Sequence, residues 1–442
     1  MLARSVALNI IGSAVSLTVG FASSLLLARW LGPSDRGLLG IMFAASQVGV
    51  AIAGLGLPVA IMYYASKRDA RSGVLLGNSL AFTAVLTAVF IPAAWLLREP
   101  LSDLLSHDRG GDLWVLAAAL VPLTFLDWTT HNQLLGKLRF GLYNVLVVAS
   151  KVATLITVVV LLGVLSFGVG GGLVSIAAAS LVMIVGSLPP ILSESRPGLD
   201  LRHFLDTVGY GVRVQVGTII QFLNYRFDVL VLQFFRPLAS VGYYVVAAIL
   251  AELVVTLALA FQSSILPLVA HYEGEEADAT TIKALRHHGI LALVATVANA
   301  GFAPLALLYG YGSAFRPALV PMFILMPGMW FLGTGTVVAG DLRGRGRPGI
   351  ASILAGITLV VTVALDLVLI PPYGVPGAAI ASVASYVVFG LASLIVLSRV
   401  TKIPVRTLVV PTRADFAVYP AALRRLRGLA ATRGRSETED VG

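Results

Sequence analysis

The sequence predicts an all-α polytopic membrane protein with twelve transmembrane helices, built as two parallel repeats of six. Three observations predict this class: an apolar composition, long apolar runs at regular intervals, and an internal repeat. Apolar residues make up 57% of the 442 residues and charged residues 12%, and the mean hydropathy is +0.91. A soluble domain carries roughly a quarter charged residues. This chain therefore needs lipid to face, and we expect no soluble domain large enough for an enzyme.

Apolar runs long enough to cross a bilayer recur along the chain. A spanning helix needs about 20 mostly apolar residues to cross a hydrocarbon core about 30 Å thick. The first run is too long for the apolar core of a signal peptide and lacks a clear cleavage site, so we expect it to be a helix. The predicted spans are residues 5–28, 38–65, 73–97, 113–136, 143–165 and 168–191, then 209–235, 241–268, 289–309, 317–340, 350–370 and 374–397.

Basic residues predict the orientation, because loops rich in lysine and arginine stay in the cytoplasm. With the N-terminus inside, 22 lysines and arginines fall on the inner side, six fall in outer loops, and three lie within spans. We therefore expect both termini to be cytoplasmic. The net charge of +9 is explained by this topology, so it does not indicate a nucleic-acid partner.

The two halves of the chain repeat one another at an offset of 205 to 208 residues. ARWLGPSDRGLLG matches QFFRPLASVGYYV, LLGKLRFG matches LRGRGRPG, and FGVGGGLVSIAAAS matches YGVPGAAIASVAS. Each of the two repeats holds six spans, an even number. The halves of the chain therefore run parallel and are related by an axis along the membrane normal. Alternating access between two rocking halves is the expected mechanism. The matched glycines are Gly37 with Gly242, Gly136 with Gly344, Gly168 with Gly374, and Gly171 with Gly377.

The same segments carry a resemblance to a known family. LARWLGPSDRG, LNYRFDVLVLQFF with VGYYVVA, and DLVLIPPYGVPGAAIAS resemble the polysaccharide-exporter branch of the multidrug, oligosaccharidyl-lipid and polysaccharide (MOP) exporter superfamily. The resemblance covers residues 4–397. It implies two six-helix lobes around a central cavity, and flipping of an undecaprenyl-diphosphate-linked oligosaccharide from the inner to the outer leaflet. A cation-coupled multidrug or small-molecule exporter of the same superfamily is the alternative.

The resemblance and the repeat together predict the organisation of the chain. We expect an N-lobe at 1–192, a cytoplasmic linker at 193–208, a C-lobe at 209–398 and a basic cytoplasmic tail at 399–442. The implied location is the bacterial cytoplasmic membrane. The implied partners are the lipid-linked oligosaccharide, membrane lipids, and a polysaccharide polymerase or glycosyltransferases.

Cations inside the spans are the first candidates for a substrate site, because placing a charge at the bilayer centre costs about 2.5–3.5 kcal/mol. Arg226 and Lys151 lie within spans, and Arg213 lies nearer the cytoplasm. Arginine suits phosphate oxygens, since its planar fork of donors can bind two at once. We expect these cations to line the cavity and hold the diphosphate. Arg29 ends the first span at the outer surface, where substrate contact and interfacial snorkelling are both open.

Acids near mid-depth offer the cations a different role. Arg226 or Lys151 could pair with an acid and fix how the helices pack, instead of binding substrate. The acids are Glu252, Asp127 and Asp228. Glu252 aligns with Gln47 at the repeat offset, so Glu252 or Asp127 is also a candidate for proton or sodium coupling.

Polar side chains also mark one face of the seventh span and the inner half of the fourth. Gln221 and Asn224 share a helical face with Arg213 and Asp228, at 100° per residue. The stretch DWTTHNQ, beginning at Asp127, is polar enough to gate the cytoplasmic mouth. We expect His131 in it to be a hydrogen-bonded wall residue and not a proton switch.

Several function classes are disfavoured. The chain has no cysteine, which excludes disulfides, thiolate metal sites and a cysteine nucleophile. A membrane glycan polymerase or ligase would need a large outer loop with catalytic side chains, yet the longest outer loop is 98–112. We therefore expect no catalytic residue, cofactor or metal site. The tail, with Leu423, Leu426 and Leu429 among arginines, is expected to lie on the anionic inner leaflet or to remain free in the cytosol.

Overall fold

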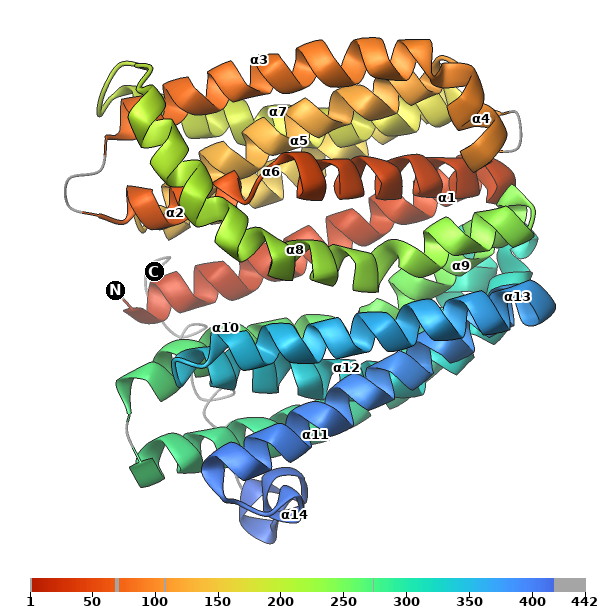
Figure 1. Cartoon of the computed structure of the whole chain (residues 1–442). Coiled ribbons are helices and arrows are strands. Elements are labelled where there is room, and N and C mark those ends of the chain that lie inside the picture. The colour runs from red at the N-terminus through yellow and green to blue at the C-terminus, as the bar shows by residue number, and fades with distance from the viewer. Residues whose placement is uncertain (1, 68–70, 107–108, 273, 417–442) are drawn as a thin grey trace, which may run out of the picture. The chain divides into compact units, whose positions relative to one another are not determined.

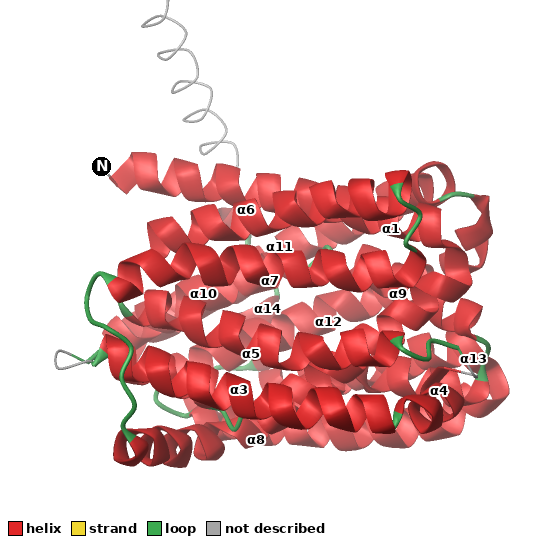
Figure 2. Cartoon of the chain, turned by 90° about the horizontal axis from the view of Figure 1, so that it is seen from above, coloured by secondary structure: helices red, strands yellow, loops and turns green. Residues whose placement is uncertain are grey.

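The computed structural model describes residues 2–67, 71–106, 109–272 and 274–416 (Figure 1). Over these ranges every regular element is a helix and none is a strand (Figure 2). Eight helices are long and apolar enough to cross a membrane, or nine if the bent pair α9 and α10 counts as one span. The predicted all-α membrane class is confirmed.

The helices are α1 (Leu2–Ala53), α2 (Leu57–Ala65), α3 (Ser72–Leu96), α4 (Arg98–Ser106), α5 (Leu113–Gly136), α6 (Phe140–Val158), the π-helix η1 (Val159–Val164), α7 (Gly168–Leu192), α8 (Leu201–Phe235), α9 (Leu238–Glu252), α10 (Val255–His271), α11 (Gly274–Leu305), the π-helix η2 (Ala306–Tyr311), the 3-10 helix η3 (Ser313–Ala318), α12 (Leu319–Gly344), α13 (Pro348–Thr401) and α14 (Val405–Val409).

The chain forms two compact units. Unit 1 holds Met1–Ala251, Gly301–Leu325 and Ala355–Ser385. Unit 2 holds Glu252–Ala300, Met326–Leu354 and Tyr386–Gly442. In unit 1, α5 packs between α3 and α7 (Figure 1).

The two longest helices, α1 and α13, are each two helices joined at a glycine. They run for 52 and 54 residues, which at 1.5 Å per residue is about 80 Å, more than twice the hydrocarbon thickness. The backbone leaves helical geometry at Gly32 (φ 71°, ψ 177°) and at Gly374 (φ 60°, ψ −128°). Glycine tolerates these positive φ values because it lacks a Cβ. The break at Gly32 falls in a predicted loop, and the break at Gly374 falls on the first residue of the predicted span 374–397.

Some predicted boundaries are wrong. The predicted span 38–65 is broken, because α1 ends at Ala53 and α2 begins at Leu57. Gly56 at this break (φ 68°) lies so close to α8 that an added Cβ would be 2.1 Å from the Gly211 carbonyl oxygen. The predicted span 241–268 is also broken, between α9 and α10. The outer loop 98–112 contains the short helix α4.

α8 begins at Leu201, inside the predicted linker 193–208. Asp200 caps this helix by accepting a hydrogen bond from the His203 N–H at 3.0 Å. Its carboxylate also pairs with Arg71 at 2.6 Å. The His203 N–H and the Arg71 guanidinium together hold the pKa of Asp200 below its ordinary value.

Glu194 ties the same linker to three other segments. Its carboxylate accepts from the Ser72 hydroxyl at 2.7 Å and pairs with Lys137 at 3.2 Å and Arg139 at 3.1 Å. The Gly73 N–H donates to the Ser195 hydroxyl at 2.6 Å. These hydrogen bonds and ion pairs therefore hold the linker against the first turn of α3 and against the turn between α5 and α6.

The internal repeat is present in the backbone. Leu138 (φ 57°) and Gly346 (φ 70°) occupy the same left-handed position in the two matched turns. The following N–H groups make the same bond, Arg139 to the Leu134 carbonyl at 3.0 Å and Arg347 to the Leu342 carbonyl at 2.8 Å. Gly168 and Gly374 match in the same way, with φ of 56° and 60°.

One pair of matched residues meets face to face within unit 1. A Cβ on Gly37 would lie 1.9 Å from the Leu238 carbonyl oxygen, and a Cβ on Gly242 would lie 2.0 Å from the Pro33 carbonyl oxygen. Pro33 and Leu238 are themselves separated by the repeat offset of 205 residues. Contacts that are exchanged in this way are what a two-fold axis produces. The contact between Gly37 and Gly242 is therefore locally two-fold symmetric.

The beginning of the tail packs on unit 2. Leu408 in α14 is fully buried in a cluster with Leu285 and Leu397. The Arg286 Nε donates to the Thr407 carbonyl at 3.0 Å, and its Nη1 pairs with Asp415 at 3.2 Å. The leucines at 423, 426 and 429, on which the membrane-surface prediction rests, lie outside the described residues.

Candidate functional site

A buried carboxylate on α8 forms the centre of a polar cluster in unit 1. The Asp228 side chain accepts hydrogen bonds from the Tyr244 hydroxyl on α9 and, at 3.2 Å, from the Ser382 hydroxyl on α13. Tyr244 and Ser382 are also hydrogen-bonded to one another at 2.9 Å. The Val229 N–H donates to the other Asp228 oxygen at 2.7 Å. Sequence reasoning singled out Asp228 but not these partners.

A second acid, Asp366 on α13, lies within electrostatic range of Asp228. Asp366 is fully buried, and neither of its carboxylate oxygens has a hydrogen-bond partner among the described residues. Asn224, one turn before Asp228, donates to the Ala355 carbonyl at 3.0 Å and accepts from the Thr362 hydroxyl at 3.4 Å. We call Asp228 and Asp366 the acid pair. Asn224 and Thr362 are the polar contact next to it.

The acid pair can hold a cation. Two ionised carboxylates in a low-dielectric interior repel one another and lose their hydration, so they need a proton or a metal ion to be stable. The hydrogen-bond partners of Asp228 are the Tyr244 and Ser382 hydroxyls and the Val229 N–H, and carboxylate and hydroxyl oxygens are ligands for hard cations. Sequence reasoning missed Asp366, although an acid inside the apolar run 350–370 is the signal that should have found it.

Arg226 lies two residues before Asp228 on α8 and is half-buried. Its one hydrogen bond, from Nη1 to the carbonyl of the neighbouring Tyr225, is long at 3.5 Å. It forms no ion pair with any residue that the structure describes, so the predicted alternative of a direct salt bridge to Glu252, Asp127 or Asp228 is not realised here. It interacts electrostatically with Asp228 and, on α1, with Arg36.

The other predicted cations are exposed on the protein surface. Lys151 on α6 lays its stem against Gly20 of α1, where a Cβ would be 3.8 Å from the lysine Cδ. Arg213 and Arg29 are exposed as well. None of these three cations has an ion pair within the described ranges. The structure therefore brings Arg226 next to the acid pair, and gives no contact that joins Lys151, Arg213 or Arg29 to it.

The remaining polar candidates occupy separate places. Asp127 pairs with His131 at 2.9 Å, one turn apart on α5, so the expected wall role of His131 agrees with this hydrogen bond. Glu252 ends α9 and is half-buried. Gln47 is half-buried on α1 and makes no hydrogen bond to a described residue. The side chain of Gln221 lies outside the described part.

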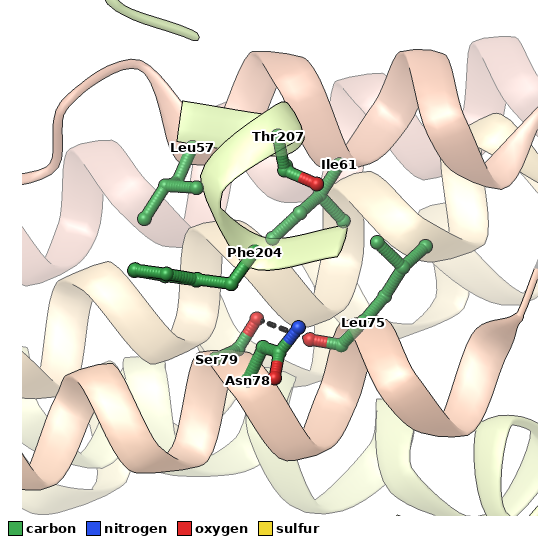
Figure 3. A pocket seen from close by; sticks show the side chains of 7 residues that line it. All are labelled: Leu57, Ile61, Leu75, Asn78, Ser79, Phe204 and Thr207. Atoms are coloured by element: carbon green, nitrogen blue, oxygen red, sulfur yellow. Dashed lines mark hydrogen bonds between the residues drawn. The ribbon is translucent and has the colours of Figure 1, made fainter. Parts of the chain in front are cut away.

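A small cavity lies between α2, α3 and the start of α8 (Figure 3). Its volume is about 10 Å³, and an open groove of about 270 Å³ adjoins it through Asn78 and Phe204. The Ser79 and Thr207 hydroxyls donate to carbonyls of their own helices at 2.7 Å. The cavity lining has no charged side chain and is therefore unsuited to a phosphate. Its lining residues are Leu57, Ile61, Leu75, Asn78, Ser79, Phe204 and Thr207.

Comparison with known families decides the family of this chain. The family model described as polysaccharide biosynthesis protein matches residues 26–320, which is more than half of the chain. The protein belongs to the polysaccharide biosynthesis protein family. This membership confirms the resemblance to the polysaccharide-exporter branch of the MOP superfamily that the sequence motifs carry.

This polysaccharide biosynthesis protein is similar to one curated protein and to several solved structures. The "probable low-salt glycan biosynthesis flippase Agl15" of Haloferax volcanii is 22% identical over 404 residues, covering 88% of this chain and 81% of the relative. The lipid II flippase MurJ in an inward closed conformation has a TM-score of 0.74 at 15% identity, covering 91% of this chain and 89% of MurJ. An inward-facing multidrug resistance MATE transporter of the MOP superfamily has a TM-score of 0.71 at 16% identity, covering 90% and 98%. The chain shares the fold of these transporters.

Proposed function

We propose that this polysaccharide biosynthesis protein is a flippase and not an enzyme. Its substrate is an undecaprenyl-diphosphate-linked oligosaccharide or a similar polysaccharide precursor, which it moves from the inner to the outer leaflet. The observation that carries the proposal is Arg226, a half-buried arginine inside a span with no ion-pair partner among the described residues. A half-buried cation that forms no ion pair is available to bind an anion, and the diphosphate supplies that anion.

The membrane arrangement follows the predicted topology. We assign twelve spans in two lobes, 1–192 and 209–398, in the bacterial cytoplasmic membrane with both termini in the cytoplasm. Two spans each come from α1 and α13, and the bent pair α9 and α10 supplies one. α8 supplies another, although its charged residues keep it out of the eight apolar candidates. The locally two-fold symmetric contact between Gly37 and Gly242 supports rocking of two halves.

Binding of the head group would use the charge and shape of arginine. The Arg226 guanidinium can donate two parallel hydrogen bonds to phosphate oxygens. Lys151 and Arg213, which are exposed and unpaired within the described ranges, add positive charge that steers the anion. Arg29 would meet the substrate at the outer surface. The polymerase and glycosyltransferases that make the polysaccharide would be the partners.

The acid pair would couple transport to a cation. Because Asp228 and Asp366 interact electrostatically, the uptake of a proton or sodium ion would neutralise the pair, and its release would restore the repulsion. This place for coupling differs from the predicted one at Glu252 or Asp127. In Asp127 the carboxylate is already paired with His131.

A cation-coupled multidrug or small-molecule exporter is the second candidate, because the acid pair and the MATE-like fold both suit it. The two candidates differ in the charge of the substrate. An organic cation would be repelled by Arg226, whereas a diphosphate would be attracted to it.

Reconstituted vesicles test the proposal. A fluorescent lipid-diphosphate-linked oligosaccharide is placed in the membrane, and its appearance in the outer leaflet is followed with a membrane-impermeant quencher. We expect flipping with the protein and none without it. Transport of an organic cation in place of the lipid-linked glycan would instead establish the exporter.

A further inference from the structure

The linker before α8 carries exposed apolar side chains that the proposed function does not use. Leu199 and Leu201 are 75% and 72% exposed, although the sequence predicts a cytoplasmic linker here. Arg196 and Arg202 lie on either side of these leucines and are also exposed, and neither forms an ion pair with any residue of the described ranges. Leucines flanked by arginines are typical of a segment in the membrane interface, with its apolar side chains in lipid and its charges at the head groups.

This segment is held in place by close contact with α3. The Gly198 N–H donates to the Gly73 carbonyl at 3.1 Å, and a Cβ on Gly77 would lie 2.2 Å from the Gly198 carbonyl oxygen. The Asn78 side chain makes two hydrogen bonds to the Asp200 backbone, accepting from its N–H and donating to its carbonyl, both at 3.1 Å. The backbone that carries the exposed leucines is therefore fixed against α3 before any ligand binds.

An open groove of about 270 Å³ lies beside this contact. Its α3 wall uses Asn78 and the residues three, four and seven positions after it, which share one face of a helix. The groove therefore follows α3 for about two turns, or about 10 Å, which is about a third of the hydrocarbon thickness. The lining residues are Asn78, Ala81, Phe82, Val85, Leu199, Leu201 and Phe204.

The inside of the groove is apolar. The Phe82 and Phe204 rings lie with their centroids 5.7 Å apart, and Figure 3 shows Phe204 reaching from α8 over α3 beside Asn78. Asn78 is the one polar residue of the lining, and its side-chain amide is already hydrogen-bonded to Asp200. None of the lining residues carries a charge. The groove therefore suits a hydrocarbon chain and is unsuited to a sugar or a phosphate.

Charge at one end of the groove indicates which chain it takes. α3 begins on the predicted cytoplasmic side, so the end at Leu199 and Leu201 is nearer the inner head groups, and Val85 lies deeper in the bilayer. Arg196 and Arg202 adjoin the inner end in the sequence. The inner leaflet carries anionic lipids, which attract exposed lysines and arginines. A phospholipid of this leaflet presents a chain and a negative phosphate in the matching order.

We propose that the groove binds one anionic phospholipid of the inner leaflet. One acyl chain lies along α3 between Phe82 and Leu201, and Arg202 and Arg196 bind the phosphate, since their planar forks of donors suit its oxygens. The bound lipid fills the space between α3 and the start of α8, and so stabilises the linker in this position. The site shares no residue with the acid pair and does not contain Arg226, so it does not depend on the proposed flippase.

Thermal unfolding of the purified full-length protein in detergent micelles tests the site. Phosphatidylglycerol and phosphatidylcholine with identical acyl chains are titrated separately, and glycerol 1-phosphate serves as a head group without chains. We expect phosphatidylglycerol to raise the melting temperature and to saturate. Phosphatidylcholine should act only at higher concentration, because it has no net charge, and glycerol 1-phosphate should have no effect.

A variant in the groove tests the chain. Ala81→Phe places a ring in the groove and should weaken the binding of both lipids at least about tenfold, because at least two methylene groups lose their burial. Its matched control is Ala88→Phe, at an exposed alanine about two turns farther along the same face and outside the groove. The control should bind both lipids like the wild type. If Ala81→Phe does not fold, Ala81→Leu and Ala88→Leu provide the same comparison.

A variant at the end of the groove tests the head group. Arg202→Gln should weaken phosphatidylglycerol about fivefold, as expected for one cation at an anionic surface, and should weaken phosphatidylcholine less. Its matched control is Arg316→Gln, on the predicted outer side, at an exposed arginine that has no ion pair with a described residue. This control should leave the binding of phosphatidylglycerol unchanged.

Three results would overturn the proposal. If the substitutions at 81 and 88 change lipid binding equally, or not at all, no chain occupies the groove. If Arg202→Gln and Arg316→Gln bind phosphatidylglycerol equally well, the phosphate is bound elsewhere. If glycerol 1-phosphate alone raises the melting temperature, the site is one for a soluble anion. None of these results bears on flipping, which the vesicle assay measures separately.

Discussion

The contact between Gly37 and Gly242 gives a prediction that can be worked from distances. In Gly37→Ala, the new Cβ would lie 1.9 Å from the Leu238 carbonyl oxygen, whereas an ordinary contact begins at 3.4 Å. The two backbones must therefore separate by about 1.5 Å. Overpacking of this kind costs roughly 1–3 kcal/mol, and the better helix propensity of alanine returns at most about 1 kcal/mol. We expect Gly37→Ala and Gly242→Ala each to lower the free energy of unfolding by about 1–2 kcal/mol.

Gly209→Ala is the matched control. Gly209 lies in α8, and an added Cβ would meet nothing within 4 Å. The control should be neutral or more stable by up to about 1 kcal/mol. The assay is thermal unfolding of the purified protein in detergent, followed by tryptophan fluorescence. If Gly37→Ala melts at the same temperature as Gly209→Ala, the close approach of Gly37 and Gly242 is refuted.

Three further predictions concern charge. Asp366→Asn should abolish the response of flipping to a proton or sodium gradient while the protein still inserts, and a full response in this variant would rule out the acid pair. Arg226→Ala should reduce flipping at least about tenfold, and Arg226→Lys should restore only part of it, because lysine keeps the charge and loses the bidentate fork. If flipping recovers in the double variant Arg226→Ala with Asp228→Asn, Arg226 serves only to neutralise the charge of Asp228. Because the pKa of Asp200 is lowered in the folded protein, its contribution to stability should be complete above the ordinary carboxyl pKa of about 4 and should be lost as pH falls through the lowered pKa. The protection factors of the amides at the start of α8, which are corrected for the intrinsic pH dependence of exchange, should therefore fall at acid pH in the wild type and change less in Asp200→Asn.

Much of the fold could be predicted from the sequence because membrane helices are specified locally. Apolar length sets each span, and glycine and proline at the ends set the breaks, as at Gly32 and Gly374. The repeat could be found because its glycines occupy positions that need positive φ or close approach. The break at Gly56 was not predicted, because it depends on contact with α8, which is distant in the sequence.

The candidate site was less predictable, since it depends on which residues meet. Asp228 was found from its place in a span, but Tyr244 and Ser382 look like ordinary wall residues until the three helices are packed. Asp366 carried a sequence signal that was overlooked, and only its electrostatic interaction with Asp228 gives it a role.

The self-matching contact at Gly37 and Gly242 has an evolutionary consequence. If the chain arose by duplication of a six-helix gene, the ancestral protein was a symmetric dimer, and this glycine was the place where each subunit touched its own copy. In such a dimer one mutation changes both sides of the contact at once. Fusion into a single chain removed that constraint, so even the residues next to the matched glycines could diverge, into Arg36 on one side and Val241 on the other. The asymmetry needed to move a charged substrate in one direction could then evolve around a contact that stayed unchanged.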